Sequence, residues 1–394
     1  MEKKIRLGII GIGNMGSAHA KHIIGGDCPD FELVAVADTN PDRLLWAKRE
    51  LSPGICVFED AMAMLDSGKI DACMVCVPHY FHPQYAIACM ERGIHVMVEK
   101  PAGVYTKQVR EMNETAKKHP EVVFGMMFNQ RTNCVYRKMH ELVQSGKYGA
   151  LRRTNWLITT WYRPQAYYDS GDWRATWSGE GGGVLLNQAP HNLDLWQWIC
   201  GMPQEVTAFC DVAKYHRIEV EDDVTIFTRY ADGAVGTFIT STGEYPGTNR
   251  LEITGDRGKL VLENGVLKRW QLAVPERTFC FSAAENTPDA AVTYEEICPD
   301  RPETAHAGIL QNFTEAVLHG TPLLALGTDG IHELTLSNAA YLSQWTGNRP
   351  VSLPFDTALF DRLLREKREQ ATAEKAPTAA PKSGKYADRW QVRW

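Results

Sequence analysis

The chain has 394 residues, of which 44% are hydrophobic and 23% charged, and its formal net charge at pH 7 is −6. This length and composition are typical of a globular protein with about two domains. The negative charge and the absence of any lysine- and arginine-rich block argue against binding to nucleic acid or to an anionic membrane, and no apolar run reaches the ~20 residues of a membrane helix.

Residues 4–130 alternate short apolar runs with longer amphipathic segments, which is typical of repeated strand–helix units. We predict strands near 5–10, 32–37, 56–58, 70–77, 94–98 and 122–128. Helices are expected near 15–25, 41–50, 60–67, 83–92, 106–118 and 133–145, and Asn40 before Pro41 is a good N-cap for the second of them. Residues 1–130 are therefore predicted to form an α/β Rossmann domain with a parallel sheet.

After Gly149 the sequence becomes β-rich, with strands expected within 151–160, 205–215, 224–240 and 251–262 and hairpin turns at Ala231–Ala234 and Gly255–Gly258. Helices are expected at 184–200, 306–319 and 328–345, the last two packing back on the first domain. Residues 131–370 thus predict an α+β domain with a large, mostly antiparallel open sheet. Residues 371–394 are linker-like, and we predict a flexible or arm-like tail.

A glycine-rich loop follows the first strand, and Asp38 ends the second. This context is typical of a dinucleotide-binding fingerprint, in which Gly11 permits a tight turn, Gly13 admits the pyrophosphate and Gly16 allows close helix packing. We expect the helix N-terminus to face the phosphates and Asp38 to bind the ribose hydroxyls, which favours NAD. NADP stays an alternative because Arg43 is close in sequence. The predicted cofactor-binding residues here are Gly11, Ile12, Gly13, Asn14, Met15, Gly16, Asp38 and Arg43.

Two further segments follow strands of the same predicted sheet. Cys76-Val-Pro-His79-Tyr-Phe-His82-Pro comes after the fourth strand, and Glu99-Lys100-Pro101 comes after the fifth. Ligands of such sheets bind at the carboxyl ends of the strands, so the Lys100 ammonium is expected beside the cofactor. With the glycine loop, these segments resemble the Gfo/Idh/MocA family, which includes glucose–fructose oxidoreductase and inositol dehydrogenases, over roughly residues 4–350.

The resemblance implies a nicotinamide-dependent oxidoreductase acting on sugars or polyols. In such a protein Lys100 reaches the substrate hydroxyl and Glu99 shapes the nicotinamide pocket. Pro78 and His82 match the family's loop after the fourth strand, which lines the cofactor, whereas the family often has asparagine where this chain has His79. All three are predicted cofactor-binding residues.

A catalytic pair is also implied by the resemblance. His191 aligns with the family's catalytic histidine, and Asn187 stands where the family carries an aspartate. Because an amide cannot carry a proton, His191 is expected to be the base, while Lys100 stabilises the developing alkoxide. Asp194, three residues further on, is an alternative source of the missing carboxylate. A continuous helix would place Asn187 and His191 on one face.

The expected substrate surface is rich in aromatic and polar side chains, since flat rings suit the C–H face of a sugar. A core or subunit contact is the alternative for the aromatic cluster. With Lys100, Asn187 and His191, the predicted substrate-binding residues are Asn129, Arg131, Trp161, Arg163, Tyr168 and Trp173.

The favoured function is oxidation of a ring hydroxyl of a sugar, glycoside or cyclic polyol by hydride transfer to NAD. One alternative is a redox-neutral, NAD-dependent glycosidase working through transient oxidation and elimination, and another is a cofactor-sensing protein without turnover. The ten cysteines lie mostly among apolar neighbours and no signal peptide is evident, so we expect a cytoplasmic protein without a metal site. A homo-oligomer, dimer or tetramer, is expected from the large sheet and from the resemblance.

Overall fold

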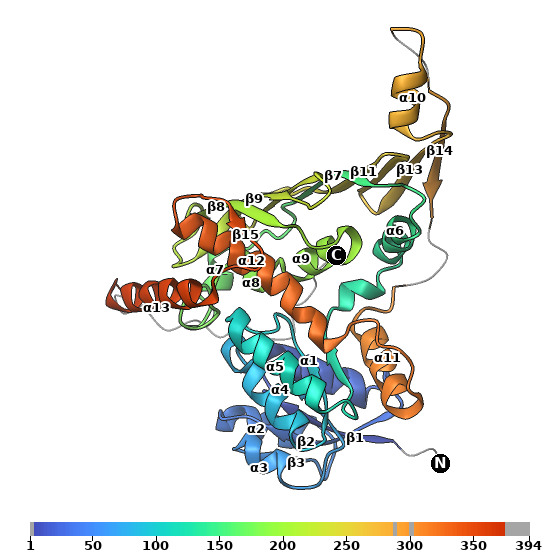
Figure 1. The fold of residues 1–394 in the computed structure, drawn as a ribbon. Helices are drawn as coiled ribbons and strands as arrows, with labels where there is room; N and C mark the ends of the chain where they lie inside the picture. Colours follow the sequence, from blue (N-terminus) through green and yellow to red (C-terminus); the bar gives the residue numbers. More distant parts are fainter. Residues whose placement is uncertain (1–3, 287–289, 299–302, 375–394) are drawn as a thin grey trace.

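The computed structural model describes residues 4–286, 290–298 and 303–374 (Figure 1). Two sheets dominate these residues, a six-stranded sheet in the N-terminal domain and a nine-stranded sheet in the C-terminal domain. Both predicted sheet types are confirmed.

The N-terminal sheet is parallel throughout and has the strand order β3-β2-β1-β4-β5-β6. Its strands are apolar runs that helices cover, and β4 is buried at every residue. The order reverses between β1 and β4, so the crevice for a ligand opens there, at the carboxyl ends of both strands. The strands are β1 Ile5–Ile10, β2 Phe31–Ala37, β3 Cys56–Phe58, β4 Ala72–Val75, β5 His95–Val98 and β6 Phe124–Met126.

The helices that follow these strands lie close to their predicted positions. Asn40 caps the second helix as expected, since its side chain accepts a hydrogen bond from the backbone N–H of Asp42. The helices are α1 Asn14–Ile24, α2 Pro41–Glu50, α3 Ala61–Leu65, α4 His82–Met90, α5 Thr106–Lys118 and α6 Cys134–Gln144, and short 3-10 turns occupy His79–Phe81 and Asn129–Thr132.

The C-terminal sheet has the order β14-β13-β12-β11-β7-β10-β9-β8-β15, and among the described strands only β7 and β10 pair in parallel. Alternating burial along β9 indicates that one face is covered, and Figure 1 shows α6, α9 and α12 on that side. Both predicted hairpins, β9–β10 and β11–β12, are confirmed. The strands are β7 Leu151–Ile158, β8 Glu205–Val212, β9 Glu221–Arg229, β10 Val235–Ser241, β11 Asn249–Gly255, β12 Gly258–Glu263, β13 Val266–Leu272, β14 Val292–Ile297 and β15 Val351–Ser352.

The late helices join the two domains. α11, Ala305–His319, packs on the N-terminal domain, where Phe313 stacks on Phe31 with ring centroids 6.3 Å apart. α12, Gly330–Trp345, contacts α5 of the N-terminal domain and β8 of the other. The connection between α11 and α12 borders the edge strand β6, because the backbone N–H of Met126 donates to the carbonyl of Ala325 in that connection.

Two expectations about this half are wrong, and one part of it was not predicted. The single helix expected at 184–200 is two helices, α8 Val184–Asn187 and α9 Pro190–Cys200, because Pro190 favours a first helical turn and cannot continue a preceding one. The tail does not begin at 371, since α13, Thr357–Glu374, continues through those helix-favouring residues. The arm formed by β13, α10 (Glu276–Ser282) and β14 was not predicted. Residues 375–394, the rest of the predicted tail, lie outside the described residues.

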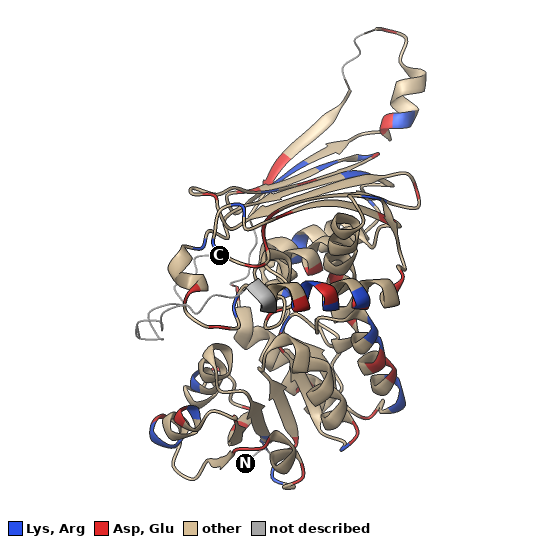
Figure 2. Cartoon of the chain, turned by 90° about the vertical axis from the view of Figure 1, so that its left-hand side faces the viewer, with Lys and Arg blue, Asp and Glu red and all other residues tan. Residues whose placement is uncertain are grey.

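Charged residues of both signs are interspersed over the view in Figure 2, and α13 carries both signs along its length. Within the described residues, no helix is both long and apolar enough to cross a membrane.

Candidate functional site

The glycine loop between β1 and α1 shows which glycines serve the fold and which leave room for a ligand. Gly11 has φ +89°, and a Cβ there would lie 2.6 Å from the carbonyl oxygen of Cys76. A Cβ at Gly16 would clash with the carbonyl of Gly11. At Gly13, by contrast, a Cβ would meet no described atom within 4 Å. The loop thus leaves open space at the one glycine that is expected to admit a pyrophosphate.

The N-terminus of α1 and the end of β2 flank that space. Gly13 caps α1 without any side-chain hydrogen bond, so the first N–H groups of the helix are available to an anion. The Asp38 carboxylate accepts the backbone N–H groups of Ile12 (2.7 Å) and Asn40 (2.8 Å), which fixes it beside the loop. The buried Oδ1 of Asn14 has no hydrogen-bond partner among the described residues. These features fit a bound dinucleotide. Met15 and Arg43 lie in the first turns of α1 and α2.

A buried carboxylate–histidine pair lies at the end of β5. Glu99 Oε1 is 2.6 Å from Nε2 of His19, which α1 contributes. Burial alone would raise the pKa of Glu99, but the hydrogen bond and charge of His19 lower it to about 2. His306, from α11, packs edge-on against His19 with ring centroids 5.4 Å apart. Glu99 is therefore ionised, and it lies where α1 and α11 meet.

The predicted cofactor loop after β4 is tied to its neighbours through both of its histidines. His82 lies 2.6 Å from the carbonyl of Pro101 through Nδ1 and 2.7 Å from that of Val77 through Nε2. Its ring therefore joins two loops and has no nitrogen left for the predicted cofactor contact. His79, beside Pro78, donates from Nδ1 to the carbonyl of Glu180 at 2.9 Å. Burial and the neighbouring His82 lower the pKa of His79 well below its usual value.

The three predicted catalytic residues come together. Lys100 Nζ donates to the backbone carbonyl of Asn187, the last residue of α8, at 2.8 Å. His191 is the second residue of α9, so the break between the two helices, not one continuous face, sets its place relative to Asn187. Burial, and then the charge of Lys100, lower the pKa of His191 well below its usual value. The imidazole is therefore neutral, the form in which it accepts a proton.

Arg131 and Asp194 have a different use from the one predicted. Arg131 is 1% exposed; its Nε and Nη2 donate to the two oxygens of Asp194 (2.8 and 2.6 Å), and its Nη1 donates to Asp329 (2.7 Å). A fully buried guanidinium requires such carboxylates, since isolated charges are costly to bury. Arg131 is thus unavailable for the predicted substrate contact, and Asp194 is not the displaced carboxylate.

The aromatic segment divides between buried and accessible side chains. Tyr168 is buried and donates to Thr242 Oγ1 at 2.8 Å, so it fastens the segment to the sheet and is not the predicted substrate contact. Trp161 is also buried, and its indole N–H donates to Asn192 at 2.9 Å, next to His191 in sequence. Trp173 is 39% exposed and lies edge-on to His79.

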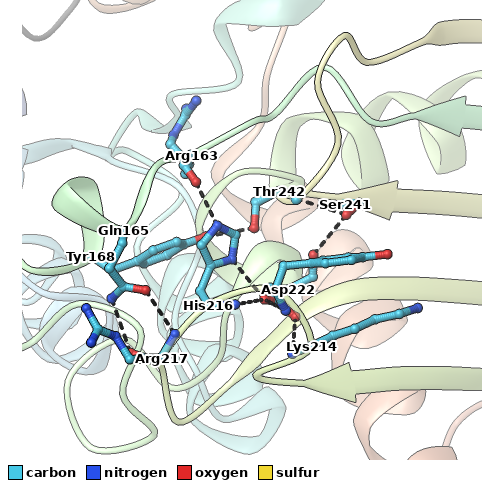
Figure 3. Close-up of polar contacts among 11 residues, drawn as sticks. Arg163, Gln165, Tyr168, Lys214, His216, Arg217, Asp222, Ser241 and Thr242 are labelled. Atoms are coloured by element: carbon cyan, nitrogen blue, oxygen red, sulfur yellow. Dashed lines mark hydrogen bonds and ion pairs between the residues drawn. The ribbon is translucent and has the colours of Figure 1, made fainter.

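The same segment is held from the side by a polar network around a buried aspartate (Figure 3). Asp222 accepts three backbone N–H groups and lies 2.8 Å from Nδ1 of His216, whose Nε2 is 2.8 Å from the carbonyl of Arg163. Figure 3 shows the Arg163 side chain pointing away from this network. Its guanidinium lies over the rings of Trp161 and Tyr167. The network therefore holds the backbone of Arg163, while the charged guanidinium lies against the two aromatic rings.

Several site residues escaped the sequence analysis. Glu180 is 2% exposed, and Asn187 Nδ2 donates closely to its Oε1. Gln188 is buried, and its side-chain oxygen has no hydrogen-bond partner among the described residues. Asn129, which was predicted, is also buried, and its side-chain oxygen likewise has no partner among them. Glu180 directly precedes the glycine run that opens the 184–200 segment, which was the one available indication. For His306, distant in sequence from every motif, no such indication exists. Among the described residues, no group of three or more His, Cys, Asp or Glu could hold a metal ion.

Comparison with known proteins finds two adjoining family models. Residues 5–126 match the oxidoreductase family with an NAD-binding Rossmann fold, and residues 136–261 match the GFO/IDH/MocA C-terminal domain. Together these matches span more than half of the chain.

Individual relatives agree with the family models. Myo-inositol 2-dehydrogenase of Thermotoga maritima is 27% identical over 85% of this chain and 95% of its own. D-glucoside 3-dehydrogenase of Escherichia coli is 32% identical over 50% of this chain and 55% of its own. The crystal structure of the WlbA dehydrogenase from Bordetella pertussis, in complex with NADH and UDP-GlcNAcA, is 26% identical, with a TM-score of 0.75 over 90% of this chain and 100% of that one.

Proposed function

The chain belongs to the Gfo/Idh/MocA family of oxidoreductases, and we propose that it oxidises a ring hydroxyl of a sugar, glycoside or cyclic polyol with NAD as the hydride acceptor. The observation that carries this proposal is the placement of Lys100 and a neutral His191 around Asn187, at the carboxyl edge of the sheet that bears the glycine loop. The named relatives act on inositol and on glucosides, which supports this substrate class.

The chemistry of the site follows from the protonation states of its residues. NAD, when bound, supplies the acceptor for the hydride that leaves the substrate carbon with both electrons of its C–H bond. The hydroxyl proton passes to the neutral imidazole of His191, while the Lys100 ammonium stabilises the negative charge that grows on the oxygen. Burial lowers the pKa of Lys100, but the charges of Glu99, Glu180 and Glu333 raise it and so favour the ammonium.

The choice of NAD rests on Asp38. Its carboxylate is fixed at the end of β2 by two backbone N–H groups and would repel the 2′-phosphate of NADP. The redox-neutral glycosidase is not favoured, since the relatives are named as dehydrogenases.

A substrate panel tests the proposal. The purified chain is incubated with NAD or NADP and with myo-inositol, methyl glucosides, levoglucosan or UDP-GlcNAcA, and nicotinamide absorbance is followed. We expect NADH to accumulate with at least one compound and with NAD in preference to NADP, and Lys100→Ala to abolish the signal. Cleavage of a glycoside without NADH accumulation would support the glycosidase instead, and NADH binding without any turnover would support a cofactor sensor.

Assembly, location and domain division extend the proposal. We propose a homo-oligomer, dimer or tetramer, because Figure 1 shows α6, α9 and α12 on one face of the nine-stranded sheet, while among the described helices only α10, on the arm beyond β13 and β14, lies on the side of the outer face. A cytoplasmic location is supported by ten cysteines that are all free of disulfides. A division near residue 130 is supported by the family models, of which one ends at 126 and the other begins at 136. Light scattering of the purified chain tests the assembly.

A further inference from the structure

A buried carboxylate outside the predicted catalytic set touches the residue that Lys100 also touches. We propose that Glu180 is the positioning carboxylate of this site, which orients the Asn187 amide and supplies a negative charge beside the Lys100 ammonium. This inference rests on the proposed dehydrogenase function and deepens it. It assigns the acid of the site to the loop before α8, while the helix itself carries only an amide at position 187.

The contacts of Glu180 aim it at the site. One oxygen accepts from Nδ2 of Asn187, and the other accepts the backbone N–H of Ala175 at 2.6 Å. Arg174 Nη1 lies 3.6 Å from the first oxygen. The backbone carbonyl of Glu180 accepts a hydrogen bond from Nδ1 of His79. Glu180 therefore links the loop after β4 to the end of α8.

Lys100 binds the backbone of Asn187, and Glu180 binds its side chain. The ammonium donates to the backbone carbonyl at 2.8 Å, and the carboxylate accepts from the side-chain amide. Three carboxylates raise the pKa of Lys100, but Glu99 is bound by His19, and Glu333 Oε1 lies 3.4 Å from the backbone N–H of Ala102. Glu99 makes the largest of the three contributions and accepts the backbone N–H of Lys100 at 3.2 Å, but Glu180 is the one that binds a side chain of the predicted catalytic set, that of Asn187.

The orientation of Asn187 follows from hydrogen-bond chemistry. An ionised carboxylate only accepts, so it must face the NH₂ group of the amide and not its oxygen. The Oδ1 atom of Asn187 is then turned away from Glu180 and serves as an acceptor for a substrate hydroxyl. A glutamine at position 180 would both donate and accept, and would no longer fix this orientation.

Glu221 provides a useful contrast, because it is equally buried and has a different use. It accepts the backbone N–H groups of Gly183 and Leu185 and the hydroxyl of Tyr341. These partners anchor the start of α8 and include no side chain of the predicted catalytic set. Burial raises the pKa of both glutamates to about 7. The shared shift comes from burial, so it is the geometry that distinguishes Glu180.

The first test measures Lys100 without substrate or cofactor. The pH dependence of Lys100 acylation by trace acetic anhydride is followed by mass spectrometry in the wild type, in Glu180→Gln and in Asp172→Asn, an exposed neighbour with the same change of charge. Loss of the Glu180 charge should lower the labelling midpoint by about one pH unit, while the Asp172 control leaves it unchanged. The carboxylate swap Glu180→Gln/Asn187→Asp should restore the midpoint. An unchanged midpoint in folded Glu180→Gln overturns the proposal.

A second variant covers loss of folding in Glu180→Gln. Glu180→Asp keeps the charge and shortens the side chain, so the Lys100 midpoint should stay within about 0.3 units of the wild type. A shift as large as that expected for the glutamine variant would show that charge is not what Glu180 supplies.

The third test uses whichever panel compound the wild type oxidises. Glu180→Gln should lower kcat at least about tenfold and change KM by less than about threefold, because the lost contribution acts on the developing charge. In the pH–rate profile, the acid limb near pH 7 should be absent from Glu180→Gln, because that limb reports protonation of Glu180. The other charged or titratable groups that face Glu180 or its backbone are Arg174, Lys100 and His79. Retention of both kcat and the limb overturns the proposal. Absence of wild-type turnover would refute the proposed function alone, since the labelling test needs none.

Discussion

A single methyl group at Gly13 separates binding of the cofactor from stability of the fold. A Cβ there meets no described atom within 4 Å, and the residue has φ −73°, a value that any L-residue adopts. Gly13→Ala loses a favourable N-cap and restricts the unfolded chain, two effects of opposite sign that are each below about 1 kcal/mol. The free energy of unfolding should therefore change by less than about 1 kcal/mol.

The same methyl group would stand where the pyrophosphate approaches the backbone. Loss of one charge-assisted hydrogen bond to a backbone N–H costs about 2 kcal/mol, which is about 30-fold in affinity. Fluorescence titration with NADH measures this affinity, and urea unfolding measures the stability of the same preparation.

Gly16→Ala is the matched opposite. Its Cβ would clash with the carbonyl of Gly11, so this variant should lose stability along with NADH affinity. If Gly13→Ala bound NADH within about twofold of the wild type, the pyrophosphate would not lie over Gly13 and the assignment of the loop would be refuted.

Three further predictions concern other residues. His191→Asn should lower kcat at least about 100-fold without changing NADH affinity. When Glu180 is replaced by glutamine and His191 is kept, the acid limb that remains in the pH–rate profile is due to His191 and should lie below pH 6.5. Arg131→Leu should cost about 3–5 kcal/mol in urea unfolding by leaving Asp194 buried and unpaired, and the double variant with Asp194→Leu should recover most of it; equal stability of single and double variants would contradict this. Burial raises the pKa of Glu180 and Glu221 from 4.5 to about 7. Their contribution to the free energy of unfolding is therefore complete below pH 4.5 and is lost as pH rises through 7, by about 3 kcal/mol each. Glu221→Gln should show a smaller difference in unfolding free energy between pH 5 and pH 8 than the wild type.

The Rossmann half was predictable because its determinants are local. Each strand is a short apolar run, and most of the helices have a polar N-cap or a glycine just after the last turn, as at Asn40 and Gly93. The break before Pro190 was also readable, since proline favours the first turn of a helix. β13 was not readable, because its central residues are polar and half-buried and it shows no clear alternation.

The site was predictable only as far as its motifs extend. Lys100 and His191 belong to recognisable segments, Lys100 just after β5 and beside Asn187, and His191 in the first turn of α9. The pairing of Arg131 with Asp194 joins residues 63 positions apart, and neither neighbourhood indicates the other. A buried guanidinium can be expected to find a carboxylate, but the sequence does not say which one, so a residue of the fold was taken for one of the site.

The amide at position 187 becomes intelligible from the charges around it. Lys100 is a cation whose pKa burial lowers and neighbouring carboxylates raise, so the number of acids beside it decides how firmly its proton is held. A carboxylate at 187 would touch Glu180, and two like charges in contact force one of them to stay protonated. An aspartate there would therefore add little negative charge and would remove the donor that faces Glu180. With the acid placed at 180, asparagine is the residue that satisfies both neighbours.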